Sequence, residues 1–470
     1  MAFRRFRAAT IAVTAAVAMS FMLVTPSAVA ETRRSASEAG APGVGDPYFR
    51  YQGNGGFDVR HYDIAFSYDP ATRRMNATTT VTAVATQKLD RFDLDFRGPD
   101  ISMLTVNGTT AGFQRDGQEL IITPGSSLPS GRVFTVVVKY AGVPPVITDP
   151  DGSIEGWVPT DDGAFVVGEP QGAPAWFPGN DHPTNKATFT FHATVPEGTT
   201  AVGNGRLLSQ TTASGWTTFV WDSTEPMATY LATVTIGKFE ITESTTPSGI
   251  PIYTAVDPRL VKRSAAAVAQ IPDIIDYYRQ TFGPYPFSST GAIIDYAPNV
   301  GYALETQTRP VFCDVPSNAV GTMAHELAHQ WFGDSVSVRH WSDIWLNEGF
   351  ATYSEWLWSE HTGGMTAQKL FEQAYAGGKQ SFWKITIADP GVVDMFSDPV
   401  YDRGAMTLHA LRGKVGDAAF FQILRQWVQA YRYGNATTTD FIKLSEKESG
   451  MDLTSFFGVW LYQKGKPTTW

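Results

Sequence analysis

Apolar and polar positions alternate along much of the first half of the chain. Between residues 62 and 68, and again between residues 187 and 194, an apolar side chain recurs at every second position. Successive side chains of a strand point to opposite faces, so a period of two is typical of half-buried strands. Gly, Pro and Asp separate these runs, and a β-branched run over residues 133–140 follows one such turn. The pattern predicts an antiparallel β domain over residues 49–245.

From about Pro251 onward, apolar residues recur with spacings of three and four. This spacing predicts helices, because positions three or four apart lie on one face of a helix. A first helix is expected over residues 260–282, kinked or divided at Pro272. Further helices are expected over residues 325–332, 347–360, 405–412, 418–430 and 439–448, with a strand over residues 291–296. The predicted fold class is α+β, with a mainly helical domain over residues 246–470 after the β domain.

The first thirty residues have the composition of a secretory signal peptide. Arg4, Arg5 and Arg7 precede an apolar run, and a small-residue cleavage site ends at Ala30. A membrane anchor is the alternative, but the run is rich in Ala and short for a membrane span. We therefore expect export, followed by a flexible leader over residues 31–48, where Ala, Ser, Gly and Pro dominate.

Composition narrows the classes of function. A chain of 470 residues exceeds one usual core, so two domains are expected. The net charge of −10 and the absence of a basic run argue against nucleic acid and against stable membrane association. Cys313 is the only cysteine, which excludes an intramolecular disulfide and a zinc site built from several thiolates. We expect Cys313 to be a buried apolar residue.

The sharpest chemical signal is the sequence His325-Glu326-Leu327-Ala328-His329. In a helix, two histidines four positions apart lie on one face, so both imidazoles can reach a single metal ion. Glu326 lies beside them, where a carboxylate can hold a water molecule without being a ligand. The alternative is a surface helix that carries two histidines by chance, and a third ligand decides between the two.

Glu348 is the strongest candidate for that third ligand. It lies nineteen residues after His329, at the start of a predicted helix that can pack beside the first. Asp334 and Asp343 are nearer in sequence, but both lie outside the predicted helices. Two nitrogens and one carboxylate suit Zn²⁺ and leave a fourth position for water or substrate. Manganese and cobalt accept similar ligands, and the ligand types favour zinc.

Several further motifs resemble the zinc aminopeptidases of peptidase family M1. The metal motif is followed by Gln330-Trp331-Phe332-Gly333 and then by Trp345-Leu346-Asn347-Glu348-Gly349-Phe350-Ala351. Segments that begin at Trp176, Pro226 and Phe282 are also similar, as is the final Trp460-Leu461-Tyr462. The resemblance covers roughly residues 50–470 and implies that the helical domain is a thermolysin-like catalytic domain. It also implies hydrolysis of the N-terminal peptide bond.

The resemblance assigns roles to individual residues. His325, His329 and Glu348 would bind one Zn²⁺ per chain. Glu326 would be the general base that deprotonates the attacking water and then protonates the leaving amine. Tyr401, in Tyr401-Asp402-Arg403-Gly404, matches the family tyrosine that stabilises the oxyanion of the tetrahedral intermediate.

Substrate contacts are implied by a second motif. The segment Tyr302-Ala303-Leu304-Glu305-Thr306 occupies the place of the family's Gly-x-Met-Glu-Asn motif. Glu305 would bind the free α-ammonium group of the substrate, and Ala303 and Leu304 would contact the substrate beside it. The Tyr and the Thr of this segment depart from the family's Gly and Asn, which leaves the side-chain preference open.

Two further acidic residues complete the expected site. Glu169, preferred on spacing over the neighbouring Gln171, matches a second position that flanks the substrate amine. Glu355 lies seven residues after Glu348 on the same side of the predicted helix, where it would orient a zinc-binding histidine from behind. A surface position is the alternative for Glu355.

The expected protein is a secreted zinc aminopeptidase whose partners are peptides with a free N-terminus. Two alternatives remain open. One is another zinc hydrolase on the same scaffold, either an endopeptidase or an epoxide hydrolase. The other is a catalytically silent relative that binds peptides. Because large members of the family carry an additional C-terminal helical domain, we also expect a more open, two-domain enzyme.

Overall fold

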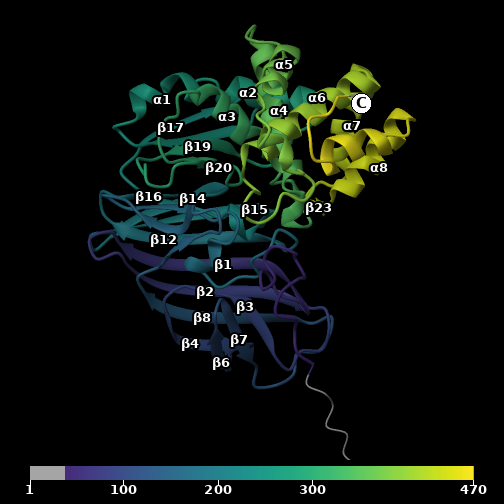
Figure 1. Cartoon of the computed structure of the whole chain (residues 1–470). Coiled ribbons are helices and arrows are strands. Elements are labelled where there is room, and N and C mark those ends of the chain that lie inside the picture. Colours follow the sequence, from purple (N-terminus) through teal and green to yellow (C-terminus); the bar gives the residue numbers. More distant parts are fainter. Residues whose placement is uncertain (1–37, 469–470) are drawn as a thin grey trace, which may run out of the picture. The chain divides into compact units, whose positions relative to one another are not determined.

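The structure is a computed structural model that describes residues 38–468 (Figure 1). The expected signal peptide, residues 1–30, and the first part of the expected leader lie outside the described residues. Within the described range, no helix combines the length and the apolar character that crossing a membrane requires.

The larger sheet of the first half has eight strands in the order β14-β15-β12-β1-β2-β8-β4-β5. The strands are β1 Phe57–Asp69, β2 Arg74–Ala85, β4 Asp100–Val106, β5 Thr109–Thr110, β8 Val133–Gly142, β12 Lys186–Pro196, β14 Arg206–Ala213 and β15 Trp216–Ala228. The predicted alternation is present in β1, where Ile64 and Phe66 are buried and Ala65 between them is half-buried. The alternation of apolar and polar positions therefore predicted the buried face of β1 correctly.

One strand pair departs from the antiparallel pattern. β1 and β12 run parallel, with His61 opposite Thr188, whereas β1 and β2 are antiparallel. The domain is thus mainly antiparallel, as predicted, with one parallel pair that the sequence pattern did not reveal. The period of two shows which face a side chain occupies, but it carries no information about the direction of the neighbouring strand.

Two smaller sheets complete this half. A five-stranded sheet has the order β13-β16-β11-β10-β9, and a three-stranded sheet has the order β3-β7-β6. The strands are β3 Phe92–Asp95, β6 Gly112–Asp116, β7 Glu119–Thr123, β9 Val146–Thr148, β10 Ile154–Pro159, β11 Ala164–Val167, β13 Thr200–Gly203 and β16 Val234–Gly237. The Trp157 ring of β10 packs edge-on against Phe66 of β1, with ring centroids 5.7 Å apart. Aromatic side chains thus join the sheets.

The second half combines a mixed sheet with helices. The sheet has the order β17-β18-β19-β21-β20, and a separate pair is formed by β22 and β23. The strands are β17 Glu240–Thr245, β18 Pro251–Val256, β19 Thr290–Ile294, β20 Ala303–Leu304, β21 Val311–Phe312, β22 Val336–Val338 and β23 Gly434–Ala436. The helices are α1 Val261–Val268, α2 Ile271–Phe282, α3 Ala319–Ala328, α4 Trp345–His361, α5 Ala367–Gly377, α6 Gly404–Val415, α7 Asp417–Ala430, α8 Thr438–Ser449 and α9 Thr454–Phe457.

Most predicted helices are present, with shifted ends. Pro272 divides the first one, because α1 ends at Val268 and α2 begins at Ile271 with the proline in its first turn. The metal-motif helix was predicted over residues 325–332, but α3 ends at Ala328 and begins at Ala319. Helix α5 was not predicted. Only Ala367 and Phe371 of this helix are buried, and its other residues are half-buried or exposed.

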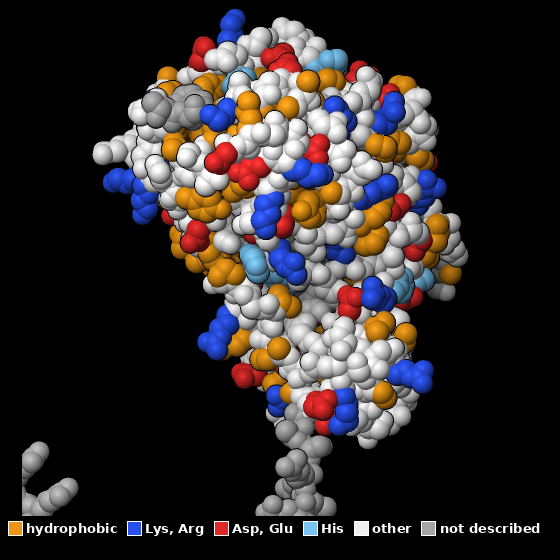
Figure 2. Space-filling model, turned by 90° about the vertical axis from the view of Figure 1, so that its right-hand side faces the viewer, with side chains coloured by type: hydrophobic (Ala, Val, Ile, Leu, Met, Phe, Trp, Pro, Cys, Tyr) orange, Lys and Arg blue, Asp and Glu red, His pale blue; other side chains and the backbone are white. Residues whose placement is uncertain are grey.

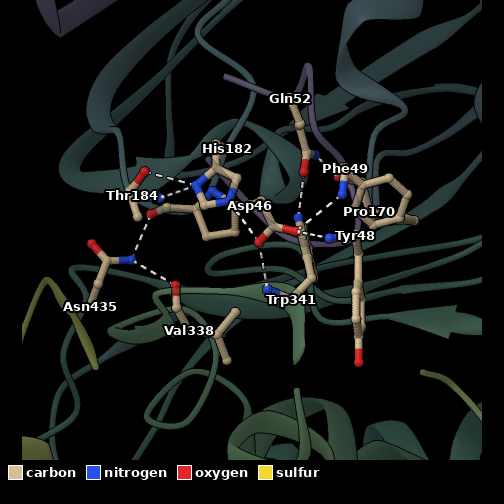
Figure 3. A network of polar contacts seen from close by, with 11 residues as sticks. Asp46, Tyr48, Phe49, Gln52, Pro170, His182, Thr184, Val338, Trp341 and Asn435 are labelled. Carbon is tan, nitrogen blue, oxygen red and sulfur yellow. Dashed lines mark hydrogen bonds and ion pairs between the residues drawn. The ribbon is translucent and has the colours of Figure 1, made fainter. Parts of the chain in front are cut away.

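A flexible leader was expected over residues 31–48, but the end of this range near Asp46 is held in the structure. The carboxylate of Asp46 is buried and accepts a hydrogen bond of 2.9 Å from the Trp341 backbone amide (Figure 3). It also lies 3.3 Å from Nε2 of His182. Small and polar composition suggested mobility, but these residues cover the junction of the two halves and are held by hydrogen bonds there.

Polar side chains join the β domain to the helical half. The Asn204 side-chain amide donates to the Gln307 carbonyl at 2.8 Å. Lys186 of β12 donates to the carbonyls of Asp334 and Ser335, at 2.8 and 3.0 Å. These contacts fix two loops, one after Glu305 and one after the metal motif.

The surface carries charges of both signs. On the face shown in Figure 2, acidic and basic side chains are interspersed with apolar ones.

Candidate active site and metal centre

Three predicted metal ligands converge between α3 and α4. His325 lies in the last turn of α3 and His329 caps its C-terminal end, so one helical turn separates them and their ring centroids are 4.7 Å apart. Glu348 lies in the first turn of α4. Its Oε2 is 3.2 Å from Nε2 of His325 and 3.5 Å from Nε2 of His329. Two imidazole nitrogens and one carboxylate oxygen therefore face one point.

The outer nitrogen of each histidine is held by a hydrogen-bond acceptor. Nδ1 of His325 lies 2.8 Å from Oε1 of Glu355, and Nδ1 of His329 lies 2.9 Å from the Phe332 carbonyl oxygen. A carbonyl only accepts, so Nδ1 of His329 carries the proton and Nε2 presents its lone pair. Glu355 thus occupies the orienting position expected from its spacing.

The chemistry of this donor set fits zinc. The ligand atoms of His325, His329 and Glu348 all lie within 4.8 Å of one another. That span accommodates an ion at about 2.0–2.2 Å from each atom, the usual zinc distance. The nearer alternative Asp343 is engaged elsewhere, because its Oδ1 accepts hydrogen bonds from the backbone and hydroxyl of Thr438.

Two further carboxylates face the same point. Oxygen atoms of Glu169, Glu305 and Glu348 lie within 4.8 Å of one another. Oε1 of Glu169 and Oε1 of Glu305 are buried, and neither has a hydrogen-bond partner among the described residues. Burial, together with the Glu305 carboxylate, raises the pKa of Glu169 well above its usual range. A cationic donor placed between these two groups would satisfy both and reverse that shift.

Glu326 is placed beside the metal ligands rather than among them. It lies on α3 next to His325. One of its carboxylate oxygens, a carboxylate oxygen of Glu305 and a ring nitrogen of His329 lie within 4.8 Å of one another. Burial raises the pKa of Glu326 to about 8. A cation bound by the neighbouring histidines would lower this pKa and leave a carboxylate able to accept a proton.

Tyr401 enters the site from a π-helical turn, Pro399–Arg403. Its ring lies 5.9 Å from the His325 ring, at 23° to it. Burial and the Glu348 carboxylate raise the pKa of Tyr401 well above its usual value, so the phenol stays protonated and can donate. Short π-helical segments are frequent at functional sites because they redirect one side chain.

Arg403 anchors this turn, and the sequence did not identify it. The buried guanidinium donates to the carbonyls of Trp460 and Ile385 at 2.8 and 2.9 Å, and to those of Val459 and Gln463 at 3.1 and 2.7 Å. The only sequence feature that could have pointed to Arg403 was its position, two residues after the candidate catalytic Tyr401. Its role depends on contacts with residues 18 to 60 positions away, which periodicity does not report.

A cavity of about 530 Å³ joins these groups. It is lined by the metal ligands, Glu326, Glu169, Glu305, Glu355, Tyr401 and Ala303, together with Asp151, Ser153, Val300, Gly301, Tyr302, Thr322 and Phe396. Asp151, Ser153 and Phe396 were not predicted, because they lie on loops whose sequence carries no recognisable pattern.

One expectation about substrate contacts changes, and the preference for Glu169 over Gln171 is kept. Leu304 was expected beside the substrate, but its side chain is buried in the core and does not line the cavity, because it points to the opposite side from Ala303. Gln171, the alternative to Glu169, is turned away. Its amide donates to Asp149 at 3.1 Å and its oxygen accepts from Arg97 at 3.0 Å.

Tyr302, which stands where the family has Gly, links the two halves. Its hydroxyl donates to the Ile154 carbonyl of β10 at 3.0 Å. The segment before Glu305 is therefore tied to the β domain. The hydroxyl of Thr306, in place of Asn, donates to the Arg309 carbonyl at 2.6 Å and closes the turn that follows.

Family models match both halves of the chain. The Peptidase M1 N-terminal domain matches residues 59–231, and the Peptidase family M1 domain matches residues 313–460. Among curated proteins, the chain is 29% identical over 320 residues to Aminopeptidase M1-B of Oryza sativa subsp. japonica, covering 62% of this chain and 36% of the relative. It is 27% identical to Endoplasmic reticulum aminopeptidase 1 of Homo sapiens, covering 87% of this chain and 50% of the relative. The chain thus spans about a third to a half of these relatives.

Solved structures match over nearly their whole length. The M1 zinc metallopeptidase from Deinococcus radiodurans superposes with a TM-score of 0.83 at 30% sequence identity, covering 90% of this chain and 98% of that one. A mutant of the same protein bound to the substrate Tyr-Ser-Ala superposes with a TM-score of 0.84 at 31% identity, over 90% of this chain and 98% of that one. The chain belongs to peptidase family M1.

Proposed function

We propose that the chain is a zinc aminopeptidase that binds one Zn²⁺ and removes the first residue of peptides with a free N-terminus. The observation that carries this proposal is the pair Glu169 and Glu305, which meets Glu348 of the metal centre within 4.8 Å. Two buried acceptors without partners beside three converged metal ligands call for a substrate that is cationic close to its reacting carbonyl.

The distance between amine site and metal centre favours removal of a single residue. An α-ammonium group held by Glu169 and Glu305 is separated from its own carbonyl by one α-carbon, so the first peptide bond lies beside the metal ligands. An internal peptide bond would leave both carboxylates buried and unpaired. An acetylated N-terminus would do the same.

In the proposed reaction, each residue of the site has a separate role. Zinc, when bound by His325, His329 and Glu348, supplies a Lewis acid that polarises a carbonyl and acidifies water. Glu326 accepts the proton of the attacking water and passes it to the leaving amine. The neutral Tyr401 phenol donates a hydrogen bond to the oxygen that gains charge when the carbonyl is attacked.

Relatives support the substrate class. The plant and human proteins reported above are named aminopeptidases, and the bacterial metallopeptidase is described with a tripeptide substrate. We also propose that the enzyme is secreted, on the strength of the signal-peptide pattern in residues 1–30. Fractionation of the producing cells, with N-terminal sequencing of the exported protein, tests this second proposal.

The central test compares two fluorogenic aminoacyl amides that differ only in N-acetylation, with and without a metal chelator. We expect hydrolysis of the free-amine substrate, its loss on chelation, and little turnover of the acetylated twin. Equal rates on both substrates would contradict aminopeptidase action while leaving a zinc hydrolase. Turnover that resists complete metal removal would contradict the metal centre itself.

A further inference from the structure

Helix α4 carries the metal ligand Glu348, and helix α6 begins directly after the turn that carries Tyr401. The two helices lie side by side (Figure 1) and touch backbone to backbone at one glycine of each. A Cβ atom on Gly349 of α4 would lie 2.7 Å from the Cα atom of Gly404, and a Cβ atom on Gly404 would lie 2.6 Å from the Cα atom of Gly349. Carbon atoms in ordinary contact lie about 3.5–4.0 Å apart, so neither position has room for a side chain.

The backbone conformation does not explain why Gly404 is a glycine. Its φ of −59° and ψ of −53° belong to an ordinary right-handed helix, which alanine adopts equally well. Glycine is a poor helix former, so a glycine on each side of one helix contact indicates that the close approach itself is needed. Gly413 of the same helix differs, because a Cβ atom there would meet open space.

The glycine contact lies next to residues of the candidate active site. Gly349 directly follows Glu348 in α4. Gly404 lies three residues after Tyr401, within one turn of helix, and the turn Pro399–Arg403 itself also packs against α4. The separation of α4 and α6 at the two glycines therefore sets the distance between the Tyr401 phenol and the metal ligands.

The residue before Gly404 is restrained as well. Arg403 holds the same turn through its hydrogen bonds to the carbonyls of residues 385, 459, 460 and 463. The turn is thus fixed at two consecutive residues, by hydrogen bonds at Arg403 and by steric contact at Gly404. A side chain at Gly404 would push the turn and α4 apart by about 1 Å, which is the difference between 2.6 Å and an ordinary carbon–carbon contact.

We propose that Gly349 and Gly404 are positioning residues, which hold the Tyr401 phenol where it can donate to the oxygen of the attacked carbonyl. The proposal rests on the proposed function for the role of Tyr401, and it adds the contact that sets the place of this phenol. Neither glycine lines the active-site cavity, so an effect of either on turnover has to pass through a neighbouring residue.

The first experiment is a double-mutant cycle that combines Gly404→Ala with Tyr401→Phe, measured on a free-amine aminoacyl amide. Tyr401→Phe removes the hydrogen-bond donor and should lower kcat about 10²–10³-fold. Gly404→Ala should lower kcat about 10²-fold by misplacing the phenol, while KM and zinc content stay close to the wild-type values. In the double variant, kcat should stay within about threefold of that of Tyr401→Phe alone. Losses that multiply would overturn the proposal, because the glycine would then act on another group.

Two further variants test the steric origin of the effect. Gly413→Ala is the matched control on the same helix, and it should keep full kcat because its Cβ atom meets open space. Gly349→Ala probes the same contact from α4 and should lower kcat about as much as Gly404→Ala, at full zinc loading. Wild-type kcat in either Gly349→Ala or Gly404→Ala would overturn the proposal.

A spectroscopic measurement follows the position of the phenol without turnover. Tyr401→fluorotyrosine is introduced, and the fluorine NMR resonance of the zinc-loaded protein is recorded with and without Gly404→Ala. We expect a shifted or additional resonance with Gly404→Ala and an unchanged resonance with Gly413→Ala. No shift with Gly404→Ala would overturn the positioning role alone. Undiminished kcat in Tyr401→Phe would instead count against the proposed function, and a shifted resonance would still support the glycine contact.

Discussion

Asp46 and Trp341 are joined by a hydrogen bond between the aspartate carboxylate and the tryptophan amide, 2.9 Å long and fully buried. The indole nitrogen of Trp341 in turn donates to Oε1 of Gln52, and the Gln52 amide donates to the carbonyl of Pro170, next to Glu169 (Figure 3). The segment before β1, which contains Asp46 and Gln52, therefore holds two parts of the site in place. One is the turn that leads into α4, and the other is the backbone beside Glu169.

Asp46→Ala should destabilise the protein. The substitution removes an acceptor shared by three backbone amides and by His182, and leaves these donors buried without a partner. We expect a loss of about 3 kcal/mol in the free energy of unfolding, measured in urea. Asp100→Ala, at an exposed position on β4, is the control and should change stability little.

Protonation of Asp46 at acidic pH should lower the stability of the folded protein. Although burial alone would raise it, hydrogen bonds from His182 and three backbone amides hold the pKa of Asp46 below the ordinary 3.8. Its stabilising contribution is therefore complete above about pH 4 and is lost as the pH falls through the lowered folded-state value. The urea midpoint of the wild-type protein should fall over that acidic range more than that of Asp46→Ala. Parallel curves for both proteins would refute this assignment.

Because of Glu119, we expect the free energy of unfolding to decrease as the pH rises through the neutral range, the opposite of the effect of Asp46. It lies directly opposite Asp95 on β3, and burial, with the Asp93 carboxylate, raises its pKa from 4.5 to about 8. Between those values the folded protein holds a proton that the unfolded chain releases, so the free energy of unfolding decreases as pH rises. Glu119→Gln should flatten this slope and raise the urea midpoint at about pH 8. A slope unchanged by the substitution would show that other groups control it.

Glu326→Gln should separate metal binding from turnover. The variant keeps His325, His329 and Glu348, so we expect one zinc per chain by elemental analysis. Loss of the proton acceptor should lower kcat by about 10²–10⁴-fold. Glu372→Gln, exposed on α5, is the matched control and should keep full activity. A Glu326→Gln enzyme with undiminished kcat would assign the base to another residue.

Glu169→Gln should act on substrate binding. Removing one of the two carboxylates weakens the hold on the ammonium group, so KM for free-amine substrates should rise about tenfold or more, while zinc content stays at the wild-type level. Gln171→Ala is the control in the same segment, since its side chain faces Arg97 and Asp149 instead of the cavity. An equal rise in KM for both variants would indicate a general disturbance of this loop.

Removal of zinc should lower stability as well as activity. A ligand that binds only the folded state stabilises it in proportion to the logarithm of its concentration over Kd. We therefore expect a lower Tm after dialysis against a chelator, and recovery of both Tm and turnover on adding zinc. Recovery of Tm without turnover would point to a bound metal that is purely structural.

The metal ligands could be predicted from sequence because their geometry is local. One helical turn places His325 and His329 together, and the helix carrying Glu348 was recognisable from its spacing. The amine site is different. Glu305 and Glu169 come from separate halves of the chain, and only the resemblance to a family linked them. No periodicity predicts that a loop of one domain will face a strand of another.

Residues that hold the site in place were the ones that sequence reasoning missed. Arg403, Gln52 and Lys186 each act through backbone carbonyls of distant segments. Any residue can offer a carbonyl, so such partners leave no trace in composition or spacing. Asp46 was assigned to a flexible leader for the same reason, since its partners are backbone amides.

Glu169 belongs to the β-rich half, whereas the zinc ligands belong to the helical half. A complete site of the proposed kind therefore needs both halves of the chain, because the zinc ligands and Glu305 lie in one half and Glu169 lies in the other. Exchange of one half between relatives should therefore retain the amine site only where Glu169 of the β-rich half still faces Glu305 of the helical half.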